Sequence, residues 1–220
     1  MMVPTSGVGI EEFYTLVEGA DVSDGHVLSA IDRALIRLGL ACALPSLNKD
    51  ASQHAIAEAL ALGASPQQIQ EIVSVIAGLG VHSLMLTSSL ITGAAGLADA
   101  DGVILFTQQE QQIWDDRVGN DPFWHRMEDE LPGFLRSMLK LSPAQFEAFF
   151  DFCAVPWQTR TVSARTKELL AMASDAMPSH RFMPGFKLHL ANAIKMGASR
   201  GAIEECLKLA ADAPSHIGVA

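Results

Sequence analysis

The sequence predicts an all-α protein assembled from two similar sets of helices. Apolar residues recur at spacings of three and four in most segments, which is the period of a helix packed on one side. The alternating apolar and polar pattern of strands is almost absent. The tripeptide Gly-Ala-Ser also occurs twice, at residues 63–65 and 197–199. Together these features favour helical repeats within a single chain.

The two tripeptides define a register of 134 residues that continues through much of the chain. At this offset Arg33 matches Lys167, and Glu71 matches Glu205. Further matches are Ser29-Ala30 with Ser163-Ala164, Leu35 with Leu169, Ala57 with Ala191, Ala59 with Ala193, Ile69 with Ile203, and His82 with His216. We therefore interpret residues 1–87 and 141–220 as two copies of one unit, joined by a helical connector at 88–140.

Each copy is expected to contain an entry helix, a helix that ends in Gly-Ala, and a capped helix that ends near a histidine. Gly63 and Gly197 can adopt the left-handed conformation that ends a helix. Ser65 and Ser199 then stand at the N-cap of the next helix. A shorter helix precedes each copy, IEEFYTLV in the first and SPAQFEAFFDF, capped by Ser142, in the second.

The connector breaks at GAAGLADADG and at RVGNDP, where glycine, proline and polar residues predict loops. Helices are expected in FTQQEQQIWDDR and in PFWHRMEDELPGFLRSMLKL. The small Ala and Gly side chains on many helix faces allow close helix packing. Because repeats of this kind bury their apolar faces against one another, we expect a homo-oligomer, for which a trimer would give six repeats.

Composition narrows the classes of partner. The chain has 220 residues, 49% of them apolar, with 15 basic against 25 acidic residues and a net charge of -10. Binding to nucleic-acid phosphates is therefore not expected. The N-terminus lacks a basic start, and the most apolar stretch is interrupted by Gly, His and Ser. We expect no signal peptide, no membrane span and a cytoplasmic location.

Three cysteines, Cys42, Cys153 and Cys206, lie far apart in the sequence. They form no C-x-x-C pair and have no histidines at metal-ligand spacing, so neither a zinc site nor a disulfide framework is predicted. We expect buried, reduced thiols and no metal or other cofactor.

The runs TKELLAMASDA and FKLHLANAIKMGASRGAIEECLKLAA resemble the carboxymuconolactone decarboxylase family, which shares an all-helical fold with the AhpD-like alkylhydroperoxidases. The family pattern falls on Glu168, on His189 with Ala193, Gly197 and Ala198, and on Glu205. The resemblance is good over 160–217 and weaker over 26–86. It implies a tandem two-repeat member of the family.

Only the second copy has the functional residues that the resemblance implies. The position of Glu168 is Ala34 in the first copy, and that of His189 is Ala55. His54 stands nine residues before Gly63, whereas His189 stands eight before its glycine. Since one residue turns a helix by about 100°, His54 points to a different side.

The alkylhydroperoxidase branch has C-x-x-C just before this histidine, because a thiolate attacks the peroxide and a second thiol resolves the product. The corresponding positions here are Phe182 and Gly185. A thiol peroxidase mechanism is therefore not expected. The decarboxylase branch tends to have an acidic residue before FKLH, a place occupied here by Met183-Pro184-Gly185.

His189 is the first candidate catalytic residue, as a general acid or base, with Glu168 to orient it and raise its pKa. The alternatives are a buried histidine bonded to a carbonyl and a carboxylate that only stabilises a helix N-terminus.

Six residues are candidates for substrate binding. Arg181, His180 and Lys187 cluster before His189 and could hold a carboxylate, although solvated surface charge is the alternative. Trp157 precedes the second copy and could form a pocket wall. His82 and His216 close the third helix of each copy, either as helix-terminal cations or facing His189.

The leading hypothesis is a cofactor-independent lyase, a decarboxylase of a small unsaturated carboxylic acid or lactone, with His189 as proton donor. Its partner would be an anionic small molecule. The alternative is a non-catalytic ligand-binding or assembly protein on the same fold. A third hypothesis, a peroxidase or reductase of the AhpD type, would require thiol chemistry.

Overall fold

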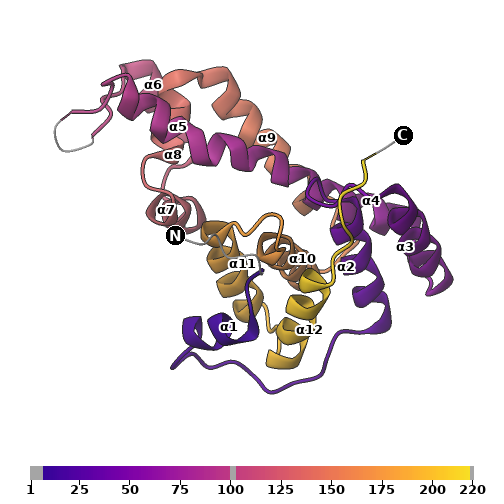
Figure 1. The fold of residues 1–220 in the computed structure, drawn as a ribbon. Coiled ribbons are helices and arrows are strands. Elements are labelled where there is room, and N and C mark those ends of the chain that lie inside the picture. The colour runs from indigo at the N-terminus through magenta and orange to yellow at the C-terminus, as the bar shows by residue number, and fades with distance from the viewer. Residues whose placement is uncertain (1–6, 100–102, 219–220) are drawn as a thin grey trace. The chain divides into compact units, whose positions relative to one another are not determined.

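The computed structural model describes residues 7–99 and 103–218 and confirms the all-α prediction (Figure 1). These residues contain no β-strand, only an isolated bridge between Asn48 and Gly218. The helices are α1 (Ile10–Leu16), α2 (Ala30–Cys42), α3 (Lys49–Ala61), α4 (Pro66–Ala77), the 3-10 turn η1 (Gly78–Val81), α5 (His82–Ala94), α6 (Gln108–Arg117), α7 (Pro122–Glu130), α8 (Phe134–Leu141), α9 (Pro143–Gln158), α10 (Ala164–Ala176), α11 (Met183–Lys195) and α12 (Arg200–Ala211).

The chain forms two compact units. Unit 1 contains residues 1–77 and 156–220, and therefore α1 to α4, the end of α9 and α10 to α12. Unit 2 contains residues 78–155, from η1 to most of α9. The chain thus leaves unit 1 after α4 and returns to it within α9.

Two sets of three helices in unit 1 share one register. The bounds of α2, α3 and α4 differ from those of α10, α11 and α12 by 134 residues at both ends, the offset predicted from the sequence. In each set the first helix packs against the other two, and α2 and α10 also pack against each other. Their buried side chains form the core of the unit, among them Leu35, Ile36, Leu38, Ile72, Leu169, Leu170 and Ile203.

The helix ends predicted at Gly63 and Gly197, and the caps predicted at Ser65 and Ser199, are confirmed. Gly63 and Gly197 have φ values of 92° and 82°, in the left-handed region that favours glycine. The hydroxyl of Ser65 accepts a hydrogen bond from the Gln68 amide at 3.1 Å. Ser199 caps α12 in the same way. These local contacts fix where α3 and α11 end and where the following helices begin.

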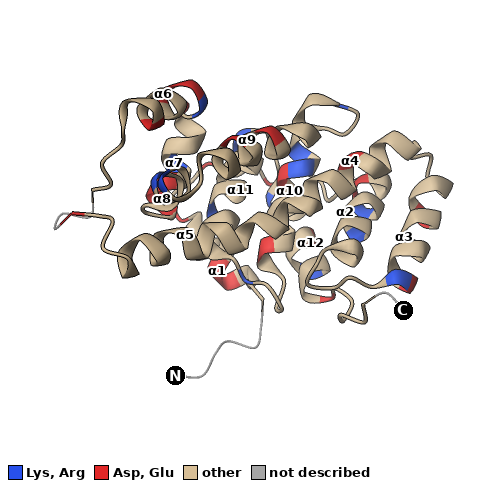
Figure 2. Ribbon diagram, turned by 90° about the horizontal axis from the view of Figure 1, so that it is seen from above, with Lys and Arg blue, Asp and Glu red and all other residues tan. Residues whose placement is uncertain are grey.

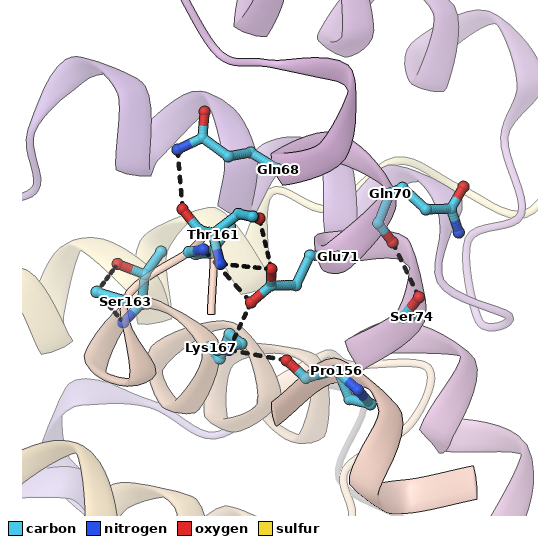
Figure 3. A network of polar contacts seen from close by, with 10 residues as sticks. Gln68, Gln70, Glu71, Ser74, Pro156, Thr161, Ser163 and Lys167 are labelled. Atoms are coloured by element: carbon cyan, nitrogen blue, oxygen red, sulfur yellow. Dashed lines mark hydrogen bonds and ion pairs between the residues drawn. The ribbon is translucent and has the colours of Figure 1, made fainter. Parts of the chain in front are cut away.

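Glu71 on α4 is the centre of a buried polar network in unit 1 (Figure 3). Its carboxylate accepts hydrogen bonds from Lys167 Nζ at 2.5 Å and from the Thr161 amide at 2.8 Å. Lys167 also donates to the Pro156 carbonyl at 2.8 Å. The network therefore satisfies a buried lysine and a buried glutamate, and joins α4 to the start of the second set of helices.

Unit 2 is built around aromatic side chains. Its helix α5 packs on α8, and the rings in contact belong to Trp124, Phe134, Phe146, Phe149 and Phe150. The segment PFWHRMEDELPGFLRSMLKL forms two helices, because Gly133 takes a φ of 79° between them. Acidic residues line α6, which ends on Arg117 (Figure 2).

Residues Pro66–Ala94 form one helical segment of 29 residues with a mean hydropathy of 1.6 over its most apolar part. By length and composition this segment could cross a membrane. Its first part is α4, whose residues Ile72, Val75 and Ile76 are buried in unit 1, where the helix packs on α2 and α10. The α4 part of the segment therefore belongs to the core of unit 1.

Candidate functional site

Helices α10 and α11 are joined by a short turn and pack closely along their length. Ser163 caps α10 by accepting a hydrogen bond from the Thr166 amide at 3.1 Å. Pro184 lies in the first turn of α11, where its missing amide costs no helical hydrogen bond. Glu168 near the start of α10 contacts His189 at the middle of α11, and Asp175 near the end of α10 lies beside Gly185 near the start of α11, so the two helices are antiparallel.

Glu168 and His189 form the central pair of the candidate site. Glu168 Oε2 lies 2.7 Å from Nδ1 of His189, and Asn192 donates to the other carboxylate oxygen at 3.2 Å. The two side chains are 5% and 19% exposed. Because a carboxylate only accepts hydrogen bonds, the contact assigns the ring proton to Nδ1 and leaves proton exchange with a substrate to Nε2.

The charge state of His189 reflects opposing effects. Burial disfavours the imidazolium and lowers the pKa. The hydrogen bond and charge of Glu168, together with the charge of Asp175, raise the pKa by more than burial lowers it. The net effect is a pKa above the usual value of a histidine. His189 therefore holds a proton at higher pH than a free imidazole does, as suits a proton donor.

The sequence reasoning missed Asp175, a second acidic residue in this part of unit 1. It lies on α10 seven residues after Glu168, a spacing of about two helical turns, and its side chain is 1% exposed. Burial raises its pKa, against the influence of His180 and His189. The spacing from Glu168 was the available signal. Asn192, three residues after His189, was missed in the same way.

The three charged residues predicted before His189 lie in different surroundings. Arg181 binds Glu12 of α1 through both terminal nitrogens, at 2.6 Å and 3.2 Å. His180 lies beside Asp175, with Nε2 3.5 Å from Oδ1. The side chain of Lys187 is exposed on α11.

The other three candidates for substrate binding lie in other parts of the chain. Trp157 in unit 1 is half-buried, with the Lys167 ammonium 5.1 Å from its ring centre. His82 begins α5 in unit 2, so the prediction that it ends a helix is wrong, because η1 interrupts the run and the helix starts again. His216 does not end a helix either. It lies beyond the end of α12, and its Nδ1 is 3.2 Å from the Leu44 carbonyl.

The first set of helices has none of these polar groups in the same register. At the positions of Glu168, Asp175 and His189 stand Ala34, Ala41 and Ala55, all buried. The position of Asn192 is Glu58, which pairs with Arg37. His54 is exposed on α3, as the helical geometry predicted.

The cysteines are poorly suited to peroxide chemistry. Burial raises the pKa of Cys42 and of Cys153 to about 11, and it raises that of Cys206 as well. A thiol with such a pKa is almost entirely protonated near neutral pH. Cys42 borders a shallow cavity of about 240 Å³ in the first copy, lined also by Leu47, Asn48, Lys49, Ser52, Gln53 and Ile56.

Comparisons with known proteins give one structural match. The sequence matches no family model and no curated protein. A crystal structure from Burkholderia xenovorans LB400 is similar, with a TM-score of 0.68 and 26% sequence identity. The match covers 83% of this chain and 71% of the other, which is provisionally named as a gamma-carboxymuconolactone decarboxylase subunit.

Proposed function

Because the chain is a carboxymuconolactone decarboxylase-like protein with the AhpD-like helical fold, we propose that it is a cofactor-independent decarboxylase of a small unsaturated carboxylic acid or lactone. The observation that carries this proposal is the 2.7 Å contact between Glu168 and His189. A buried carboxylate that orients an imidazole is a common arrangement for a general acid.

The chemistry needs a sink for electrons and a source of one proton. When the carbon–carbon bond to the carboxylate breaks, carbon dioxide leaves and the electron pair flows into the conjugated carbonyl of the lactone. His189 then delivers its Nε2 proton to the carbon of the resulting enolate at which the electron pair forms a new carbon–hydrogen bond. The imidazole afterwards takes up a proton from solvent. Glu168 stabilises the imidazolium, so its removal lowers the supply of protonated His189.

The substrate anion requires a cation in an otherwise acidic protein. We assign this role to Arg181, His180 and Lys187, with Trp157 and His216 as further substrate contacts in unit 1. Since Arg181 is bound to Glu12, it would exchange that carboxylate for the carboxylate of the substrate. An apolar surrounding favours loss of carbon dioxide by desolvating the negative charge. A cytoplasmic homo-oligomer, such as a trimer, is part of the same proposal.

The test is turnover of carboxylated butenolides, measured as loss of ultraviolet absorbance and release of carbon dioxide. His189→Ala should reduce turnover by at least about 100-fold, the usual contribution of a general acid. His54→Ala removes an exposed histidine of the first copy and serves as the matched control. Equal loss in both variants, or full activity in His189→Ala, would refute the role of His189.

A non-catalytic binding protein is the alternative, and the absence of the site residues from the first copy favours it. Such a protein would bind the butenolides without consuming them, and titration calorimetry would detect the binding. Peroxidase activity would instead depend on thiols. It would disappear when Cys42, Cys153 and Cys206 are all changed to Ser, whereas decarboxylation would persist.

A further inference from the structure

Asp175 is a buried acidic group to which the proposed decarboxylation gives no role except through its charge, which helps to raise the pKa of His189. It lies on the same face of α10 as Glu168, about two turns further along. Its side chain is 1% exposed. Burying a carboxyl group is costly unless it has partners, so its presence in a helix otherwise rich in Ala and Leu calls for a reason.

Gly185 on α11 leaves the space that Asp175 occupies. A Cβ atom at this position would lie 2.2 Å from Oδ2 of Asp175, far closer than van der Waals contact allows. Gly185 precedes His189 by four residues and therefore lies on the same face of α11, one turn away. The two helices thus place Glu168 against His189 and Asp175 against Gly185.

His180 is held beside Asp175 by the turn between the helices. The amides of His180 and Arg181 donate to the Met177 carbonyl, and the Phe182 amide donates to the Asp175 carbonyl at 2.9 Å. His180 Nε2 lies 3.5 Å from Oδ1 of the Asp175 side chain. The backbone hydrogen bonds of the turn therefore hold residue 180 near the end of α10, where its imidazole lies beside the carboxyl group.

His180 and His189 are groups of unit 1 that favour the charged form of the Asp175 carboxyl. Arg181, the next residue, is bound to Glu12 instead. Asp175 thus lies beside His180 and is also influenced by the charge of His189, which has Glu168 as its hydrogen-bond partner. Two acids and two imidazoles thus lie on α10, α11 and the turn that joins them.

We propose that His180 and Asp175 form a second carboxylate–imidazole pair in the site of Glu168 and His189, with His180 as a further proton-transfer group and Asp175 as its positioning residue. The pair adds a second activity, the exchange of carbon-bound hydrogen in unsaturated lactones that lack the carboxylate. This inference rests on the proposed function for its substrate class.

The exchange step balances without any oxidant or reductant. His180 takes a proton from the carbon next to the conjugated system, and the electron pair of that bond flows into the carbonyl to give a dienolate. The imidazole exchanges its proton with solvent. A solvent-derived proton then returns to carbon from an imidazole and restores the lactone. In deuterium oxide, the net change is replacement of hydrogen by deuterium.

The experiment incubates the full chain with an uncarboxylated butenolide in deuterium oxide and follows deuterium incorporation by NMR. We expect the wild type to exchange well above the buffer rate, and His180→Gln to lose about 100-fold. The exchange rate should fall more than the decarboxylation rate in this variant. His54→Gln, which changes an exposed histidine, should exchange as the wild type does.

Two further variants test the positioning role. Asp175→Asn keeps the shape and removes the charge, while Gly185→Ala places a methyl group where the carboxyl group lies. Both should slow exchange by about tenfold or more and shift the ring nitrogen resonances of His180, which report its tautomer and charge. Asp212→Asn, at an exposed position, should do neither.

The outcomes separate this inference from the proposed function. Exchange without decarboxylation would support the second pair and refute the decarboxylase. Decarboxylation without exchange would refute the second pair alone. The second pair would also be refuted if His180→Gln exchanged as fast as the wild type. The same holds if the His180 resonances did not shift in a folded Asp175→Asn variant. Circular dichroism and thermal unfolding establish that each variant is folded.

Discussion

Lys167 of α10 and Glu71 of α4 form a fully buried ion pair, with Nζ 2.5 Å from Oε1 and side chains 2% and 1% exposed. The residues 134 positions away form the reciprocal pair, Arg33 of α2 with Glu205 of α12. In each case the cation of one set of helices binds the carboxylate of the other. The amides of Leu28 and Val162, also 134 residues apart, donate to these same two carboxylates.

Lys167→Met should reduce the free energy of unfolding by about 3–5 kcal/mol, because it leaves a buried carboxylate without its cation. Arg33→Met is the matched control, since that pair is partly exposed and should cost only about 1 kcal/mol. Urea denaturation of both variants measures the difference. Equal costs would contradict the importance of burial for this pair.

Acid should weaken unit 1 through Glu71. Burial raises its pKa, but hydrogen bonds from Lys167 and Thr161 lower it more, to about 2. A folded pKa below the unfolded value gives stability that is present above about pH 4.5 and lost as the pH falls toward 2. The free energy of unfolding, measured against pH, should therefore fall in this window. Glu71→Gln should flatten the dependence.

Decarboxylation should decline on the alkaline side as His189 loses its proton. Because the pKa of His189 is raised, the decline should occur above 6.5, the usual value. Glu168→Gln removes the charge that favours the imidazolium, so the decline should move to lower pH. The measurement is kcat/KM against pH, with the exposed Glu18→Gln as control. An unmoved profile would show that another group donates the proton.

The same variant should change stability in a defined direction. A histidine with a raised pKa stabilises the fold below its unfolded pKa, and this contribution is lost as the pH rises through the folded value. Glu168→Gln should therefore lower the melting temperature more at pH 6 than at pH 9. Calorimetric scans at the two values measure this, and an equal loss at both would exclude the charge of His189 as the cause.

Helix termination at Gly63 and Gly197 should depend on the absence of a side chain. An alanine at either position would have to adopt a positive φ, at a cost of about 1 kcal/mol. Gly93→Ala, inside α5 with open space around it, should instead be neutral or stabilising. Thermal unfolding compares the variants. A stabilised Gly63→Ala would show that the helix end tolerates another conformation.

Much of the fold could be predicted because the decisive signals are local. Serine caps, glycine stops and the helical period of apolar residues act within a few positions. The same holds for the shared register of the two sets of helices. Even so, the sequence could not reveal that the cation of each set of helices pairs with the carboxylate of the other set. Arg33 and Glu205, for example, lie in distant segments of the chain.

The candidate site was predicted only in part. The resemblance to a known family pointed to Glu168 and His189, and the structure brings these two together. Asp175 was not recognised, because its place depends on a missing side chain at Gly185 of a neighbouring helix. Arg181 was expected to be available to an anion, but no sequence pattern links it to Glu12, 169 residues away.

The chain order of unit 1 has a consequence for how the protein is made. Because α2 and α4 complete their core with α10 and α12, the first set of helices cannot complete that core until residues 164–211 have been synthesised. During translation, the whole of residues 78–155 emerges in between. The apolar faces of α2 and α4 thus lack part of their cover until residues 164–211 have been synthesised, and transiently exposed apolar surface of this kind promotes aggregation.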